Sequence, residues 1–352
     1  QLTLANAIGL VLLLLLGHFH HPGQLVGVEV QPDLAALAAL NLEENGWSRE
    51  GRAVSADVSD PGAFPEAAFD LAVSNPPYYE SGKSLASPDP GRAAARHSLS
   101  AGYAEFLDAG RRALAPGGRF CLVAPAGRLP QILELAAARG LPPRLLRPLR
   151  STASDEPHLV MIQLRKGSGA ACLTLPPMDL RGEDGTYTPE VALWLGDADP
   201  PGPRFLCDVM VGKLARYLRL IGADAAYAND AADDWLLEQA SRAGRILLTR
   251  DRPLLAACAR AGVRAFDPGH DDPKEQMARV RSAFAGGGML GDGPRCLDCN
   301  APVLPVERQE ALGKVPRYTY LTQERFSACP CCGKLTWEGS HLERFRKMIC
   351  AL

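Results

Sequence analysis

Short apolar runs alternate with helical patterns along the first half of the chain. Strand-like runs occur at residues 24–30, 52–56, 70–74 and 118–124, and an apolar-faced helix begins near Pro32. Strands that alternate with helices indicate βαβ units and a parallel sheet covered on both faces. The hydrophobic pattern therefore predicts an α/β domain in this half.

The same alternation returns in the second half. A strand is expected at residues 204–208, a helix at 212–220 and another strand at 245–249. The Pro/Gly-rich segment 198–203 is typical of a linker, and three glycines at 286–288 mark another break. A chain of 352 residues is long enough for two to three domains. We therefore expect a domain at 1–197, the linker 198–203, a second α/β domain at 204–288 and a small module at 289–352.

Four cysteines of this small module, Cys296, Cys299, Cys329 and Cys332, form two Cys-x-x-Cys pairs. Two such pairs supply the four thiolates of a tetrahedral zinc site. Disulfides or a chance arrangement are the alternative. The other six of the ten cysteines show no paired spacing, which suits a reducing compartment. The sequence predicts a structural Zn²⁺ and a cytoplasmic protein.

The apolar run at residues 8–16 raises the question of a membrane segment. It is too short to cross about 30 Å of hydrocarbon as a helix, so we expect a buried helix and no membrane association. Because the chain begins with Gln1, we also expect an upstream segment.

Charge divides unevenly between the two halves. Residues 1–203 carry 16 Lys and Arg against 22 Asp and Glu, whereas residues 204–352 carry 22 against 18. A mildly basic second half is compatible with a polyanionic partner.

Acidic residues stand at strand ends in the second α/β domain. Asp208 ends the strand at 204–208, Asp251 follows the strand at 245–249, and Asp234 opens a helix between them. Because the carboxyl ends of parallel strands meet at one edge, these carboxylates could surround Mg²⁺ or Mn²⁺. Such ions activate a water molecule for the hydrolysis of a phosphodiester bond. The alternative is that the acids are turn formers or caps, with Asp233 as a helix N-cap.

Basic residues recur every three positions in the helix after Asp208. Lys213, Arg216 and Arg219 predict a cationic stripe beside the acids, where a phosphate backbone would bind. A solvated charged face is the alternative.

The first domain carries the tetrapeptide Asn75-Pro76-Pro77-Tyr78 directly after a strand. The Asn75 amide and a proline carbonyl can accept from an exocyclic amine, while Tyr78 stacks on an unstacked base. A plain Asn-Pro turn is the alternative. Glu29 and Asp57, at the ends of two earlier strands, suit the ribose and adenine of S-adenosylmethionine, although each alone reads as a strand-end acid or cap.

These motifs resemble the bacterial tRNA(Val) adenine N6-methyltransferase family over residues 4–196. The resemblance implies a Rossmann-like methyltransferase domain, S-adenosylmethionine as cofactor and tRNA as substrate. The family's first loop reads Asp-x-Gly-x-Gly-x-Gly, whereas this chain keeps only Gly9, and alanine methyls there argue against cofactor binding. The matching runs are Val-Gly-Val-Glu-Val-Gln-Pro at 26–32, Asn-Pro-Pro-Tyr-Tyr at 75–79, Arg-His at 96–97, Pro-Gly-Gly-Arg-Phe at 116–120 and Asp-Gly-Thr-Tyr-Thr-Pro-Glu at 184–190.

From residue 204 onward the chain resembles the Mut-seven C-terminal RNase family, a PIN-like nuclease domain with an appended zinc ribbon. The resemblance implies metal-dependent RNA cleavage with Asp208, Asp234 and Asp251 as ligands. Trp235 stands where a further acid often follows, which leaves a fourth ligand open. The matching runs are Phe-Leu-Cys-Asp at 205–208, Gly-Lys-Leu-Ala-Arg-Tyr-Leu-Arg at 212–219, Asp-Asp at 233–234, Gly-Arg-Ile-Leu-Leu-Thr-Arg-Asp at 244–251 and the two cysteine pairs.

The hypothesis is an RNA-directed protein, acting on tRNA, with a metal-dependent ribonuclease half and a methyltransferase-like half that has lost cofactor binding. One alternative keeps both activities, and another is a non-catalytic RNA-binding adaptor. We expect the zinc ribbon to be a basic platform beside the nuclease cleft. The sequence leaves the oligomeric state open.

Overall fold

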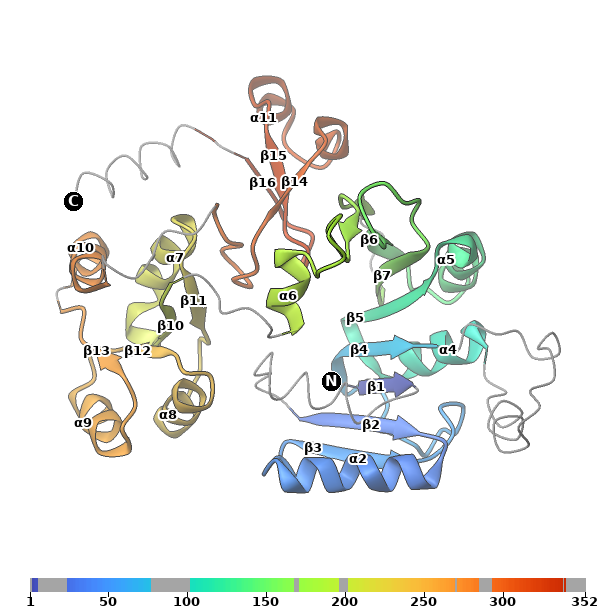
Figure 1. Cartoon of the computed structure of the whole chain (residues 1–352), viewed down its shortest axis with the longest axis horizontal. Coiled ribbons are helices and arrows are strands. Elements are labelled where there is room, and N and C mark those ends of the chain that lie inside the picture. Colours follow the sequence, from blue (N-terminus) through green and yellow to red (C-terminus); the bar gives the residue numbers. More distant parts are fainter. Residues whose placement is uncertain are drawn as a thin grey trace. The chain divides into compact units, whose positions relative to one another are not determined.

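The computed structural model describes residues 2–5, 24–76, 102–167, 171–195, 202–269, 271–284, 293–337 and Gly339. The chain divides into two compact units, residues 1–188 (unit 1) and 189–352 (unit 2) (Figure 1). The division therefore falls before the predicted linker at 198–203. The predictions for Gly9, Tyr78 and the apolar run at 8–16 lie outside the described residues.

Unit 1 is built on a nine-stranded sheet in the order β3-β2-β1-β4-β5-β7-β6-β8, with β9 also paired to β6. The first five strands of that order run parallel, and β7 is antiparallel to both β5 and β6. The strands are β1 (Leu2–Ala5), β2 (Leu25–Glu29), β3 (Gly51–Ser55), β4 (Phe69–Asn75), β5 (Leu114–Pro125), β6 (Pro143–Arg150), β7 (Leu159–Arg165), β8 (Leu173–Thr174) and β9 (Met178–Asp179). The order 3-2-1-4-5 is that of a doubly wound sheet, which confirms the Rossmann-like prediction.

Helices pack on this sheet through small and apolar side chains. The helix α4 approaches β5 so closely that a Cβ built on Gly110 would lie 2.7 Å from the Phe120 ring. Only glycine fits this contact without displacing the ring, so Gly110 sets the distance between helix and sheet. The helical elements of unit 1 are α2 (Pro32–Glu44), α4 (Tyr103–Ala113), η2 (Ala126–Arg128) and α5 (Leu129–Ala137).

Unit 2 contains a four-stranded parallel sheet in the order β11-β10-β12-β13. Its strands are β10 (Arg204–Cys207), β11 (Asp224–Tyr227), β12 (Ile246–Leu248) and β13 (Ala265–Phe266). Its helical elements are α6 (Pro189–Leu195), η3 (Val209–Val211), α7 (Gly212–Leu220), α8 (Asp233–Arg242), α9 (Arg252–Ala261) and α10 (Pro273–Phe284).

Alternate residues of β10 enter two separate cores. Phe205 and Cys207 pack in the cluster that α7 and α10 contribute to, whereas Leu206 packs with residues of α8 and α9. Figure 1 shows these helix pairs on opposite faces of the sheet. The apolar run Phe205-Leu206-Cys207 of β10 is therefore buried on both faces, as a continuous apolar run predicts.

The end of unit 2 is a small antiparallel sheet in the order β14-β15-β16. The strands are β14 (Leu304–Val306), β15 (Phe326–Ala328) and β16 (Leu335–Trp337), with η5 (Arg308–Ala311) and α11 (Arg317–Thr322) between the first two. Within the described part of the chain, no helix is long and apolar enough to cross a membrane.

Candidate functional site

The acidic residues of unit 2 lie where its sheet changes direction. The strand order places β10 between β11 and β12. The connection from β10 therefore runs outward to β11, whereas the connection from β12 runs the other way to β13. Ligands bind open α/β sheets at this point, beyond the carboxyl ends of the strands. Asp208 follows β10 directly and is only 3% exposed, and Asp251 stands three residues after β12.

A buried hydroxyl joins the two strand ends. Thr249 Oγ1 donates a hydrogen bond to Asp208 Oδ2 at 2.7 Å and accepts one from the Asp251 backbone N–H at 3.0 Å. Thr249 is fully buried. It therefore fixes the orientation of the Asp208 carboxylate. Thr249 was not among the residues predicted for this site, although a hydroxyl between an apolar strand and an acidic helix cap is a signal visible in the sequence.

Asp251 is also a helix cap, as the alternative interpretation expected. Its Oδ1 accepts a hydrogen bond from the Leu254 backbone N–H at 3.0 Å, at the first turn of α9. A carboxylate has acceptor sites on both oxygens, so capping does not exclude a second role.

Of the two adjacent acids that open α8, Asp233 is the one coupled to the strand ends. Partial desolvation, followed by the negative charges of Asp251, Asp208 and Asp234, raises the pKa of Asp233. Asp233 is not the helix N-cap, because Ala232 occupies that position. The charges of Asp208 and Asp251 therefore act on Asp233.

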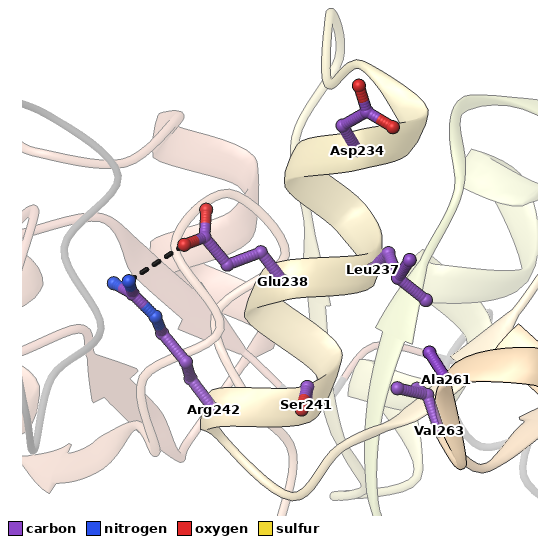
Figure 2. Close-up of a pocket in the computed structure, with 7 residues that line it drawn as sticks. All are labelled: Asp234, Leu237, Glu238, Ser241, Arg242, Ala261 and Val263. Carbon is purple, nitrogen blue, oxygen red and sulfur yellow. Dashed lines mark ion pairs between the residues drawn. The ribbon is translucent and has the colours of Figure 1, made fainter. Parts of the chain in front are cut away.

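Asp234 was predicted to be the third acidic ligand, and it lines a pocket beside α8. It borders an open pocket of about 490 Å³ between α8 and the end of α9 (Figure 2). Residues four positions apart share a helix face, so Asp234 lies above Glu238, which pairs with Arg242 at 2.7 Å. The pocket is lined by Asp234, Leu237, Glu238, Ser241, Arg242, Ala261 and Val263. Asp233 and Asp234 are both exposed, and Asp234 as the third acidic ligand stays a prediction.

The basic stripe on α7 is shorter than predicted. Lys213 and Arg216 are exposed, whereas Arg219 is 3% exposed and belongs to the buried face. A three-residue spacing drifts by about 60° per step around a helix, so the third member has rotated by about 120° from the first. Arg219 is thus corrected from an exposed phosphate ligand to a buried structural residue. Burial lowers the pKa of its guanidinium.

The four cysteines of the two Cys-x-x-Cys pairs come together as predicted. Their sulfur atoms all lie within 4.8 Å of one another, with Cys296 and Cys332 3.6 Å apart and Cys299 and Cys329 3.2 Å apart. A zinc ion with bonds of about 2.3 Å requires sulfur–sulfur edges of about 3.8 Å. The sulfur positions therefore fit one tetrahedral ion. In the described ranges, this is the one set of three or more cysteine, histidine or acidic side chains close enough to hold an ion.

Each cysteine pair closes on the same local turn. The residue after the second cysteine, Asn300 or Gly333, has a positive φ and donates its N–H to the carbonyl of the first cysteine at 2.9 Å. Cys331 lies within the second turn, where its N–H donates to Cys329 Sγ at 3.3 Å. Hydrogen bonds within the cluster lower the pKa of Cys332 and raise that of Cys299, so these thiols do not ionise independently. We call the residues 295–300 the first zinc knuckle.

Glu29 is the best-defined polar residue of the candidate cofactor site in unit 1. It ends β2 and is 2% exposed, and its Oε1 accepts from the Gln31 N–H at 3.1 Å. Its Oε2 is buried and has no hydrogen-bond partner among the described residues. Burial raises the pKa of this carboxylate. A buried acceptor without a donor is costly, so this oxygen suits a ligand hydroxyl.

The other described members of this site are less specific. Asp57 Oδ1 accepts from Ser59 N at 2.8 Å and Ser59 Oγ at 2.7 Å, which is a local turn. Asn75 is the exposed last residue of β4 and pairs in register with Ala5 of β1. The sheet of unit 1 changes direction between β1 and β4, so Asn75 does lie at the expected binding edge.

Comparisons with known proteins agree with the two halves. Residues 203–349 match the family model of the Mut7-C RNAse domain. The parallel sheet, the acidic edge and the four cysteines described above all fall within this Mut7-C domain. The resemblance of the second half is thereby confirmed.

The first half is similar to curated methyltransferases. The tRNA1(Val) (adenine(37)-N6)-methyltransferase of Erwinia tasmaniensis is 28% identical over 187 residues, which is 53% of this chain and 75% of that protein. The enzyme of the same name from Dickeya chrysanthemi is 30% identical over 166 residues, 46% of this chain and 65% of that protein. The crystal structure of a protein described as a predicted O-methyltransferase, from Agrobacterium tumefaciens, is 16% identical to this chain. The match covers 56% of this chain and 90% of that protein, with a TM-score of 0.44. Unit 1 is thus a methyltransferase-like half.

Proposed function

We propose that the Mut7-C domain cleaves RNA with Mg²⁺ or Mn²⁺ bound at the carboxyl edge of its sheet. The observation that carries this proposal is the buried Asp208 carboxylate, oriented by Thr249 at the point where the sheet changes direction. Partial desolvation, and after it the negative charges of Asp251, Asp208 and Asp234, raise the pKa of Asp233, and a bound divalent cation would offset the charge contribution. Asp208, Asp233 and Asp251 do not lie close enough together in this structure to hold an ion as a set, so binding would have to draw their carboxylates together.

When bound, such an ion would lower the pKa of a water and neutralise charge on a phosphate. The protein's own residues divide the remaining work. Thr249 holds Asp208 in one orientation, and the α9 cap holds Asp251. Lys213 and Arg216 are exposed on the helix that begins four residues after Asp208 and would contact the phosphate backbone of RNA.

Cleavage of total tRNA by the full chain, with Mg²⁺ or Mn²⁺ and with neither, tests this proposal. We expect cleavage to need the cation and to disappear in Asp208→Asn and Asp251→Asn. The matched pair Asp233→Asn and Asp234→Asn tests the third acid, because only the first should lose activity. Loss in Asp234→Asn alone would return that role to Asp234.

The same assay separates a nuclease from the adaptor alternative. RNA that binds the full chain without being cleaved under either cation would favour a non-catalytic adaptor. Full cleavage by Asp208→Asn would refute the acidic site altogether.

We propose, as a second function, that unit 1 binds S-adenosylmethionine and transfers its methyl group to a tRNA adenine. The curated relatives are named for that reaction. The observation that favours this alternative over lost cofactor binding is the buried Glu29 Oε2, which has no donor among the described residues and would accept from the ribose hydroxyls. Asn75, at the same edge, would accept from the adenine amine.

Calorimetry with S-adenosylmethionine on the full chain tests this second function. We expect binding by the native chain and at least about tenfold weaker binding by Glu29→Gln, because the amide replaces one acceptor by a donor. Absence of binding at millimolar cofactor would support the original hypothesis that the altered loop has lost it.

A further inference from the structure

The edge strand of the nuclease sheet is completed by two side chains. β11 is the outer strand, and its residue Ala225 is fully buried, so its outward N–H and C=O need partners. Asn300 Oδ1 accepts from the Ala225 N–H at 3.1 Å, and Arg219 Nε donates to the Ala225 carbonyl at 2.8 Å. Asn300 and Arg219 therefore occupy the place of a neighbouring strand.

Both side chains are tied to the first zinc knuckle. Asn300 directly follows Cys299, and its position is set by the knuckle turn, in which its φ is 64° and its N–H bonds to the Cys296 carbonyl. Arg219 Nη1 donates to the Leu297 carbonyl, inside the same turn, at 2.6 Å. The geometry that presents these groups to β11 is thus the geometry of the knuckle.

Further contacts hold the knuckle against the start of β11. Asn300 Nδ2 donates to Asp224 Oδ1 at 2.7 Å, and Arg245 donates to the same oxygen at 2.7 Å and to the Phe205 carbonyl at 3.0 Å. Arg295 Nε donates to the Gly222 carbonyl at 3.2 Å. Asp224 begins β11, Phe205 is the second residue of β10 and Arg245 directly precedes β12, so the cluster spans the amino-terminal edge of the sheet.

This edge is opposite to the one that carries Asp208 and Asp251. The expectation of a zinc platform beside the nuclease cleft is therefore corrected for the first knuckle. The knuckle contacts the sheet at its amino-terminal ends, where residues contribute to stability rather than to chemistry.

We infer that the first zinc knuckle and the edge strand β11 open and close as one unit, so that loss of zinc exposes this edge of the nuclease sheet. Zinc fixes Cys296 and Cys299, and these two fix the turn that presents Asn300 and the Leu297 carbonyl. Without the ion the turn loses its anchor, and the buried groups of Ala225 and Arg219 lose their partners together. This coupling does not depend on the proposed cleavage activity.

Amide hydrogen exchange on the full, zinc-loaded chain tests the coupling. Zinc is removed with a zinc-selective chelator, and metal content is measured in parallel. We expect exchange at residues 224–227 to become about tenfold faster or more, with no change at residues 119–125 of unit 1. Unchanged exchange at 224–227 after the zinc has left would overturn the inference, and so would an equal rise at 119–125, since that would be general unfolding.

The variant Asn300→Gly breaks the link while keeping the knuckle. Gly333 occupies the corresponding place in the second cysteine pair, so glycine is compatible with this turn. We expect one equivalent of zinc to remain bound and the Ala225 amide to exchange about tenfold faster. Exchange at the native rate in this variant would contradict the inference.

Asp298→Asn is the matched control in the same turn. It removes only the exposed ion pair between Asp298 and Lys334, at 2.8 Å, and leaves the backbone contacts of the knuckle in place. We expect native exchange at 224–227 in this control. Equal acceleration in Asp298→Asn and Asn300→Gly would show that the edge contact is not what couples the two parts.

Discussion

Replacement of Thr249 by valine removes one hydroxyl from the centre of the acidic edge and changes almost nothing else. Valine matches the shape of threonine but replaces its hydroxyl by a methyl group. Because Thr249 is fully buried, water does not replace the lost hydrogen bonds. Asp208 Oδ2 loses its donor, and the Asp251 N–H loses its acceptor.

The expected cost follows from these two contacts. A hydrogen bond to a charged acceptor contributes about 1.5–3 kcal/mol, and one between neutral groups contributes about 0.5–1.5 kcal/mol. Thr249→Val should therefore lower the free energy of opening of this sheet by about 2–4 kcal/mol. Thr249→Ser keeps the hydroxyl and loses one buried methyl, at a cost of about 1 kcal/mol.

Hydrogen exchange of residues 204–208 and 246–250 in the full chain measures this difference, and tRNA cleavage is followed in parallel. A gap of about 2 kcal/mol between the two variants corresponds to roughly thirtyfold faster exchange in Thr249→Val than in Thr249→Ser. Cleavage should fall in the valine variant and persist in the serine variant. Equal exchange and equal cleavage by both variants would refute the role of the hydroxyl.

Three further predictions concern charged residues. Asp233→Asn should raise the melting temperature at pH 7 without divalent cations. The raised pKa of Asp233 means that the folded state binds this proton more tightly than the unfolded state, so the negative charge opposes folding at neutral pH. This penalty disappears as the pH falls through the raised pKa, and thermal scans at pH 7 and pH 4 check it. Lys213→Ala and Arg216→Ala should weaken RNA binding and each reduce the salt slope by about 1 in a titration, while melting temperatures stay native. Arg219→Ala should leave RNA affinity native, lower the melting temperature and, as its main effect, accelerate amide exchange at β11. Unchanged RNA affinity in Lys213→Ala and Arg216→Ala would show that α7 is not part of the RNA-binding surface.

Several features of the site could be predicted because they depend on neighbours in sequence. Each Cys-x-x-Cys pair is formed by one local turn, so the spacing alone indicated the ligands Cys296, Cys299, Cys329 and Cys332. The strand ends that carry Glu29, Asn75 and Asp208 were also located, because each of these residues follows a short, largely apolar segment, which is typical of a strand in a covered sheet.

Other features depend on packing between elements. The choice between the adjacent acids Asp233 and Asp234 stays a prediction, because it depends on how α8 packs against α9. Arg219 follows Lys213 and Arg216 in spacing, but its exposure depends on the zinc knuckle, which is about eighty residues away in sequence. The first distinction is not encoded in the local pattern, whereas the rotation of Arg219 away from Lys213 follows from helix geometry and only its contacts are non-local.

The sequence by itself determined the alternation of strands and helices, the two halves and the cluster of four cysteines, because periodicity and short turns are local properties. The tertiary structure alone decided that Thr249 orients Asp208 and that Asn300 completes the edge strand β11. Both contacts join residues more than forty positions apart, and their strength comes from burial, which only the assembled sheet provides.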